Sequence, residues 1–221
     1  MKSSRLIPVL ALLIAVSVAS AADPGVVQLP AVKTSGPVSV EQALNQRRSL
    51  RNPDPAPLTL GQIGQLCWAA QGLTDEKGHR TAPSAMATYP LELYVIAGAV
   101  TDLEPGLYHY EPTGHALKLV TPGDQRKTFM EKAVGQEWIA TAPAIFVISG
   151  VAGRMDRMKE RAAGFMWVEA GLAAQGFFLE ATALGLGSTY VGGFAPPDAR
   201  TALGLASTEE VLAVLPVGRK P

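Results

Sequence analysis

The longest helical pattern in the chain, residues 154–184, constrains the fold more than any other feature. It is rich in apolar and small residues and ends at Gly185, a residue type that commonly terminates helices. Three polar residues interrupt the apolar surface and rule against a membrane span: Glu169, Gln175 and Glu180. We therefore expect a long central helix around which the rest of one domain is organised, and no membrane span in the mature chain.

Small residues in this helix recur at spacings of seven, four and seven, at Ala163, Ala170, Ala174 and Ala181. Such spacings place them on one narrow face, where another helix could approach closely. Two interpretations are open: the face meets its own copy across a two-fold axis, or it packs inside one subunit.

The remaining elements mix strands and helices without regular alternation. Capping boxes and apolar periodicity predict helices over residues 40–48 and 60–71, and a short helix is expected after Pro122. Alternating or continuously apolar runs predict strands over 91–97, 106–110, 116–120, 144–149, 188–192 and 211–217, with a hairpin turn at 111–114. This order favours an α+β layered domain with a central, mainly antiparallel sheet flanked by helices.

The N-terminus has the pattern of an export signal. Lys2 and Arg5 precede an apolar stretch at 6–18, and residues 19–21 (ASA) form a small-x-small cleavage pattern. An uncleaved membrane anchor is the alternative, although the apolar run is short for a bilayer span. The predicted division is a signal peptide at 1–21, a linker or wrapping arm at 22–37 and one domain at 38–221. The mature protein is then periplasmic or secreted.

Charge and reactive side chains exclude several classes of function. Nineteen basic and nineteen acidic residues give a net charge of zero, so no global field attracts nucleic acid. The only cysteine, Cys67, cannot form an internal disulfide and is expected to be a buried, inert thiol. No His, Cys and Asp cluster has metal-ligand spacing. His79, His109 and His115 are expected to be surface groups.

A basic cluster, RRSLR at residues 47–51, follows the first predicted helix. The helix dipole leaves partial negative charge at that end, which favours cations there, and guanidinium groups can hold a phosphate bidentately. A phosphate ligand is the first hypothesis. A solvated helix end that binds nothing is the alternative.

Three further segments carry possible site residues. The loop 81–90 (TAPSAMATYP) is small and hydroxylated, so its backbone could lie against a planar ligand. Glycines at 192–193 permit a close backbone approach to a ligand. Arg219 adds a basic group at the exit of the last strand. Each has an ordinary interpretation as well: a plain loop, a turn, or a solvated tail.

These segments occur together in one order: RRSLR (47–51), PSA (83–85) before YPLELYV (89–95), EAG (169–171) with AQ (174–175), and ALGLGS (183–188) before VGGF (191–194). In this combination the chain resembles the nitroreductase family of flavoproteins, and within it the SagB-type branch of thiazole/oxazole maturation dehydrogenases. The likeness covers residues 38–220.

The resemblance implies a nitroreductase-like homodimer that binds two FMN molecules at its interface. It assigns the FMN phosphate and ribityl chain to Arg47, Arg48, Ser49 and Arg51, with Arg219 beside the phosphate. It assigns a loop that reaches the flavin from the partner subunit to Pro83, Ser84, Ala85 and Met86, and the edge around flavin N5 to Val191, Gly192 and Gly193.

The implied activity is hydride transfer through flavin N5 from a reduced donor such as NAD(P)H to a small organic acceptor, a nitro compound or a quinone. An exported member would need another donor, or would oxidise its substrate and pass the electrons onward. Two alternatives stay open: a dehydrogenase or oxidase of a peptide or small molecule related to azoline oxidation, and a flavin-binding protein without turnover.

Two sequence details bear on the substrate class. Residues 86–89 (MATY) replace the Asn and Gln that enteric-type enzymes carry after the proline–serine pair, as in the maturation branch. No match to the Lys-Tyr pair of azoline-oxidising enzymes is found. Glu169, a carboxylate among apolar residues, is expected to have a structural partner across the dimer or at a helix end, or to serve as an acid or base.

Overall fold

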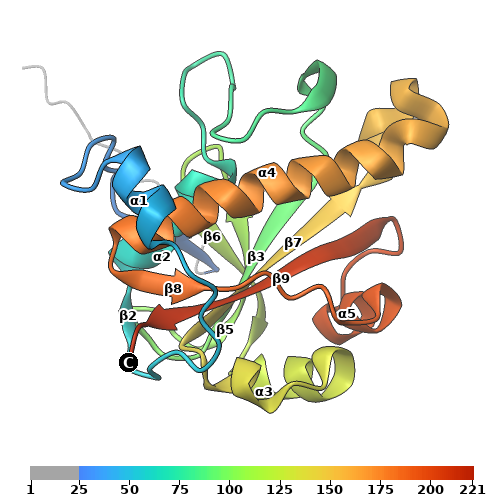
Figure 1. The fold of residues 1–221 in the computed structure, drawn as a ribbon. Helices are drawn as coiled ribbons and strands as arrows, with labels where there is room; N and C mark the ends of the chain where they lie inside the picture. Colours follow the sequence, from blue (N-terminus) through green and yellow to red (C-terminus); the bar gives the residue numbers. More distant parts are fainter. Residues whose placement is uncertain (1–24) are drawn as a thin grey trace, which may run out of the picture.

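The computed structural model describes residues 25–221, so the predicted signal peptide lies outside the described residues. A seven-stranded sheet forms the centre, in the order β1-β6-β5-β3-β7-β9-β8. Every neighbouring pair in this sheet is antiparallel. The α+β architecture with a mainly antiparallel sheet and flanking helices is therefore confirmed (Figure 1).

The strands of the large sheet are β1 Val26–Gln28, β3 Leu91–Ala97, β5 Gly106–Glu111, β6 Ala116–Pro122, β7 Ala144–Val151, β8 Leu186–Ser188 and β9 Glu209–Arg219. A separate parallel pair consists of β2 Leu58–Thr59 and β4 Val100–Thr101. The α-helices are α1 Val40–Gln46, α2 Leu60–Gln71, α3 Arg126–Phe129, α4 Ala162–Ala183 and α5 Pro196–Leu203. Single-turn and 3-10 or π segments are η1 Ala85–Ala87, η2 Met130–Val134, η3 Glu137–Thr141 and η4 Ala152–Arg161.

The sheet is buried on both faces. In β7, Phe146 and Ile148 face one apolar cluster, which includes residues of α2 and α4, while Ile145 and Val147 face a second, which includes residues of α5 and η2. Because successive side chains of a strand point to opposite faces, a strand covered on both sides must be apolar at nearly every position. The continuous apolar run in the sequence follows from this placement, and Phe146 packs on Phe177 of α4 with ring centroids 4.8 Å apart.

Local capping explains why the first two helices begin where the sequence predicts. The Gln42 backbone N–H donates to Ser39 Oγ over 3.2 Å, and the Gln62 N–H donates to Thr59 Oγ1 over 3.1 Å. In both helices the Gln side chain in turn accepts a hydrogen bond from the backbone N–H of the cap residue. These reciprocal bonds satisfy N–H groups that the first helical turn leaves unpaired.

Several element boundaries differ from the sequence prediction: β7 and β9 extend by two residues beyond the predicted ends, and three other differences have a local cause. The first helix ends at Gln46, two residues early, because Arg47 adopts φ −58°, ψ 124°. The segment before Ala162 is the 3-10 segment η4, with Lys159 at φ 49°, and only Met155 of its residues is buried; without an apolar stripe to pack, the longer α-helix is not stabilised there. The strand expected at 188–192 is instead β8, at Leu186–Ser188.

Part of the predicted linker or arm belongs to the sheet. Strand β1 pairs with β6 in an antiparallel register and adds an edge strand. Leu29, which follows it, is 4% exposed and joins the core. The segment 22–37 therefore includes an integral element in the part that is described.

Of the two interpretations of the small-residue face of α4, the structure supports packing within the subunit. Ala170, Ala174 and Ala181 are buried and belong to the core, whereas Ala163 is exposed. The approach to α2 is close, since a Cβ on Gly176 would lie 2.6 Å from the Ala69 carbonyl oxygen.

The outward face of α4 is different in character. It exposes large apolar side chains: Trp167 is 41%, Val168 60% and Leu172 45% exposed. By length and composition alone the helical segment 152–183 could cross a membrane, but a core helix meets the same criterion. Here α4 packs on the sheet with its inner face in the core (Figure 1).

Candidate functional site

The arginine cluster lies against one edge of the sheet. Ser49 forms a parallel bridge with Ser188 of β8, and the Leu50 backbone N–H donates to the Ser188 carbonyl oxygen over 3.0 Å. Five residues after Ser49, the Asp54 N–H donates to the Arg219 carbonyl oxygen over 3.0 Å. The segment 49–54 therefore crosses the ends of β8 and β9, and it brings the cluster at 47–51 to the same edge as Arg219.

Two paired glycines form the platform under this segment. Gly187 of β8 lies opposite Gly218 of β9 in the antiparallel register. A Cβ on Gly187 would lie 2.6 Å from Leu50 Cδ2, and a Cβ on Gly218 would lie 2.7 Å from Pro53 Cβ. These contacts are too short for any side chain, so the glycines are what lets the segment lie flat on the strands.

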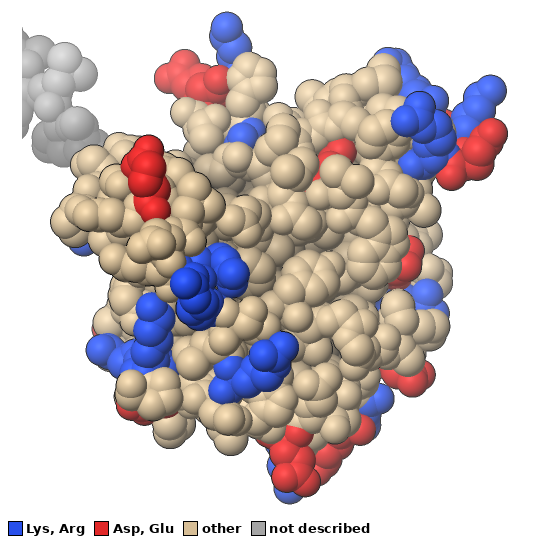
Figure 2. Space-filling view, in the orientation of Figure 1, with Lys and Arg blue, Asp and Glu red and all other residues tan. Residues whose placement is uncertain are grey.

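The guanidinium groups at this edge keep their charge available. Within residues 25–221, none of Arg47, Arg48, Arg51 and Arg219 forms an ion pair with an acidic side chain. Among the residues that the structure describes, the Arg48 side chain donates only to the carbonyl oxygens of Asn45 and Arg47, over 3.0 and 2.7 Å. Figure 2 shows basic side chains gathered on this face below α1, towards the C-terminal end of the chain. Such a set of donors suits a phosphate group.

A buried hydroxyl adds a second unpaired polar group here. Ser188 is 4% exposed, and its Oγ has no hydrogen-bond partner among the described residues. Buried polar atoms in folded proteins are nearly always paired, because an unpaired one loses its hydration without compensation. The hydroxyl lies in the bridge to Ser49, directly beside the arginine cluster. Sequence reasoning did not single out Ser188, since its burial depends on the pairing of two distant segments.

The Gly192–Gly193 segment follows directly from β8. Val191 exchanges backbone hydrogen bonds with Val214 of β9, over 2.9 and 3.2 Å, and this anchors the segment at the middle of that strand. The next two N–H groups, of Gly192 and Gly193, make no hydrogen bond with the described residues. A Cβ on either glycine would meet nothing closer than 3.6 Å. Internal packing therefore does not require glycine here, and both residues are exposed.

The proline–serine loop is held in an unusual conformation. Three of its residues have positive φ: Met86 at 54°, Ala87 at 53° and Tyr89 at 44°. Among the hydrogen bonds that hold it, Tyr89 N–H donates to Ser84 Oγ over 2.8 Å, Ala85 N–H donates to Glu169 Oε1 of α4 over 2.8 Å, and the Arg154 guanidinium donates to the Tyr89 carbonyl oxygen over 3.1 Å. Pro83 and Met86 are exposed at its surface.

The structure does not bring all the expected site residues together within one chain. The arginine cluster, Arg219 and the Gly192–Gly193 segment share the edge formed by β8 and β9. The loop with η1 lies on the opposite side of α4, above it in Figure 1, whereas the segment after α1 runs below. Within one protomer, the two groups of expected site residues therefore lie on opposite sides of α4.

Other side chains singled out in the sequence have structural partners. Glu169, 4% exposed, finds its partner in its own chain, the N–H of Ala85 at the start of the 3-10 segment η1. Cys67 is fully buried, and burial raises the pKa of its thiol well above its ordinary value, which fits an inert group.

The histidines depart in part from expectation. His79 is exposed beside Asp75, as predicted. The other two are half-buried and hydrogen-bonded, His109 to Glu92 over 2.8 Å and His115 to Tyr110 over 2.9 Å, so their assignment as surface groups was wrong. Both lie in the β5–β6 hairpin, whose inward-facing side chains pack in the core.

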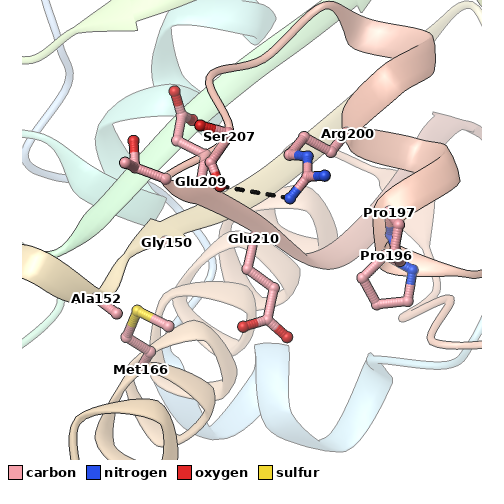
Figure 3. Close-up of a pocket in the computed structure, with 10 residues that line it drawn as sticks. Gly150, Ala152, Met166, Pro196, Pro197, Arg200, Ser207, Glu209 and Glu210 are labelled. Atoms are coloured by element: carbon pink, nitrogen blue, oxygen red, sulfur yellow. Dashed lines mark hydrogen bonds between the residues drawn. The ribbon is translucent and has the colours of Figure 1, made fainter.

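A cavity of about 440 Å³ lies near the end of the glycine segment (Figure 3). Pro196 and Arg200 of α5, Met166 of α4 and Glu210 of β9 line it. The Arg200 guanidinium donates to the Ser207 carbonyl oxygen over 3.4 Å. The neighbouring Glu209 carboxylate accepts from Ser149 Oγ over 2.8 Å and from Tyr94 Oη, and burial raises the pKa of Tyr94. The cavity gives a small molecule room between α5, α4 and the start of β9.

Comparison with known proteins fits this geometry. The model of the nitroreductase family matches residues 44–219, and the chain belongs to that family. A protein of Methanocaldococcus jannaschii with the provisional name nitroreductase MJ1384 is 37% identical over 195 residues, 88% of this chain and 96% of that protein. A provisionally named nitroreductase from Ralstonia eutropha is 31% identical, with a TM-score of 0.79 over 89% of this chain and 90% of that one.

More distant structures share the fold. The McbBCD microcin synthetase of E. coli, with truncated pro-MccB17 bound, is 22% identical, with a TM-score of 0.71 over 80% of this chain and 70% of that one. An NADPH:FMN oxidoreductase of Vibrio harveyi, complexed with NAD+, is 19% identical, with a TM-score of 0.59 over 81% and 68%.

Proposed function

We propose that this protein is an FMN-dependent oxidoreductase whose two flavin sites are each completed by both protomers of a homodimer. The observation that carries the proposal is the edge of β8 and β9. Among residues 25–221, this edge gathers four guanidinium groups without an ion pair, a buried hydroxyl without a hydrogen bond, and two backbone amides without a hydrogen bond. Cations suit the phosphate of a mononucleotide, and amide donors suit the polar edge of its ring.

Each group has a defined task in this proposal. Arg47, Arg48, Arg51 and Arg219 hold the phosphate, and the Ser49 hydroxyl donates to the phosphate or the ribityl chain. The Gly192 N–H donates to flavin N5, and the absence of a side chain lets the ring lie against the backbone. Residues 83–86 of the partner cover the ring, which would bring the separated half-sites of two protomers together.

The outward surface of α4 and α1 supports a dimer. Val40 and Leu44 of α1 are 63% and 52% exposed, and Trp167, Val168 and Leu172 of α4 extend the same kind of surface. Large apolar side chains gathered in this way mark an interaction surface. Gly164 and Gly171, also in α4, leave open space within 4 Å of the point where a Cβ would stand, so a partner can approach closely.

When bound, FMN would supply two-electron redox chemistry between a reduced donor and a small acceptor such as a nitro compound or a quinone. The residues of this chain bind and orient it. The guanidinium groups fix the phosphate end, the amide at Gly192 fixes the edge of the ring, and the cavity beside Pro196 admits the substrate. NAD(P)H is the proposed donor.

Anaerobic mixing of the FMN-loaded protein with NADPH tests the activity. Rapid bleaching of the yellow colour, followed by its return on addition of a quinone or nitro compound, is the expected result. Bleaching by an organic donor but not by NADPH would indicate instead a dehydrogenase or oxidase, and a flavin that neither donor reduces would indicate a binding protein without turnover.

Export is a separate proposal. We propose that residues 1–21 are a cleaved signal peptide and that the mature protein acts outside the cytoplasm. Expression of the full chain in a bacterium, followed by mass measurement of the purified protein, is expected to give a species that begins at Ala22. A cytoplasmic species of full length would contradict export.

A further inference from the structure

The buried carboxylate of Glu169 is not among the proposed flavin contacts, but it bonds the backbone of the proline–serine loop. Its Oε1 accepts the Ala85 N–H over 2.8 Å, and the side chain belongs to a residue only 4% exposed. Within the described part of the chain Glu169 forms no ion pair. Burying a charge costs free energy unless a bond to it compensates. Here the compensating bond goes to the backbone of a loop 84 residues away in sequence.

The loop that donates this bond has a backbone conformation that is unfavourable without external contacts. Met86, Ala87 and Tyr89 have φ of 54°, 53° and 44°, a region that residues with side chains rarely adopt. Such a conformation persists where surrounding contacts over-determine it, and it is often associated with a functional site. Glu169 holds Ala85 from outside the loop, and the Arg154 guanidinium, also outside it, donates to the Tyr89 carbonyl oxygen over 3.1 Å, whereas the Ser84–Tyr89 bond lies within the loop itself.

The position of Glu169 links the loop to the surface that faces a partner. Trp167, Val168 and Leu172, close to it in α4, are 41%, 60% and 45% exposed. Glu169 points inward to the loop, while these neighbours point outward. The loop lies on the other side of α4 from the arginine cluster of its own chain (Figure 1).

We infer that Glu169 is a positioning residue that acts across the dimer: it fixes the proline–serine loop of its own protomer, and that loop completes the FMN site whose arginines belong to the partner. This inference rests on the proposed FMN site. It adds that FMN bound by one protomer depends on a buried carboxylate of the other.

Single variants test whether Glu169 controls flavin binding. Glu169→Gln keeps an oxygen acceptor for the Ala85 N–H and is expected to bind FMN within about threefold of wild type. Glu169→Leu removes the acceptor, and its FMN dissociation constant is expected to rise at least tenfold. Ala85→Pro removes the donor from the loop side; the extended conformation of Ser84, φ −133°, ψ 139°, accepts a following proline. The same loss of affinity is expected in this variant, whose change lies outside α4.

Mixed dimers test whether the effect crosses the interface. Coexpression with two affinity tags yields dimers with one Arg47→Ala protomer and one Glu169→Leu protomer. If Glu169 acts across the dimer, one site combines both defects and the other has neither. The mixed dimer is then expected to bind one FMN with wild-type affinity, although both parent homodimers bind weakly.

Three results separate the possible failures. A mixed dimer with two weakened sites and none of wild-type affinity would overturn the inference, because Glu169 would act on its own protomer's site. Wild-type affinity in Glu169→Leu would overturn it as well. If wild-type protein itself binds no FMN, the proposed function fails first, and deuterium exchange at residues 84–89 still tests the anchor: the Glu169→Leu loop is expected to exchange faster, and unchanged exchange contradicts it.

Discussion

Ser49 pairs with Ser188 in a parallel bridge, and this pairing fixes the arginine cluster to the edge of the sheet through backbone bonds alone. Since the main chain holds the segment, the guanidinium groups of Arg47, Arg48 and Arg51 are not needed to hold it. None of them forms an ion pair among residues 25–221. A rigid backbone that carries uncommitted cations is the arrangement expected of an anion site.

Replacement of Arg47 tests the phosphate contact. Arg47→Ala is expected to lose FMN on dialysis, because removal of one charge-assisted hydrogen bond costs about 1.5–3 kcal/mol, roughly tenfold to a hundredfold in affinity. FMN fluorescence in the dialysate measures the loss.

The matched control is Arg157→Ala. Arg157 is exposed in η4 and makes no hydrogen bond or ion pair with the described residues, so the variant removes the same charge elsewhere. It is expected to retain FMN as wild type does. Equal retention of FMN by both variants would rule out the phosphate role of Arg47.

Substitution of two glycines of the site is expected to have different effects, on stability at Gly187 and on FMN affinity at Gly192. Gly187→Ala places a Cβ 2.6 Å from Leu50, which should destabilise the fold by about 1–3 kcal/mol. Gly192→Ala meets nothing closer than 3.6 Å within the protomer, so its stability should stay within about 0.5 kcal/mol of wild type. Its FMN affinity, however, should fall, because the new methyl group lies where the ring is proposed to rest.

Chemical unfolding and FMN titration of both glycine variants distinguish these effects. A Gly192→Ala protein that binds FMN as tightly as wild type would show that the ring lies elsewhere.

The exposed apolar face of α4 gives a prediction about the oligomer. Val168 is 60% exposed, so Val168→Glu should leave the protomer folded. In a dimer that buries this face, the new carboxylate would be desolvated without a partner, and the variant should be monomeric in light scattering. It should also lose FMN, because each monomer keeps only half a site. A dimer of unchanged stability would place the interface on another surface.

Acid stability depends on Glu92. Burial by itself raises the pKa of this carboxyl, but hydrogen bonds with His109 and Arg154 outweigh it and hold the pKa below the ordinary value of a glutamate. A carboxyl with a lowered pKa in the folded state stabilises the protein above its unfolded pKa, and this contribution disappears as pH falls through the folded value.

Glu92→Gln is therefore expected to lower the melting temperature above about pH 5, with a difference from wild type that shrinks towards about pH 3. Glu76→Gln, at an exposed residue without an ion pair in the described structure, is the control and should follow wild type throughout. A constant difference between Glu92→Gln and wild type at every pH would indicate lost packing rather than lost charge.

Much of the fold could be predicted because its signals are local. The capping boxes at Ser39 and Thr59 fix two helix starts, and the apolar run at 144–149 identifies the central strand. The predictions that were wrong concerned elements whose limits depend on contacts with distant segments or on local backbone geometry. The strand after Gly185 ends at Ser188 because residues 189–190 leave the ladder before Val191 pairs with Val214, and in residues 152–161 only Met155 is buried.

The site divides in the same way. Residue types predicted the arginine cluster and the glycine segment, and the structure brings them to one edge. The paired glycines Gly187 and Gly218, the unpaired Ser188 hydroxyl and the bond between Glu169 and Ala85 were beyond sequence reasoning, because each requires two segments far apart in the chain to meet.

Titration of FMN into the flavin-free protein, combined with light scattering, tests the central claim most directly. The account predicts a homodimer that binds two FMN molecules and becomes yellow in proportion. A monomer that stays colourless after excess FMN is removed would contradict it.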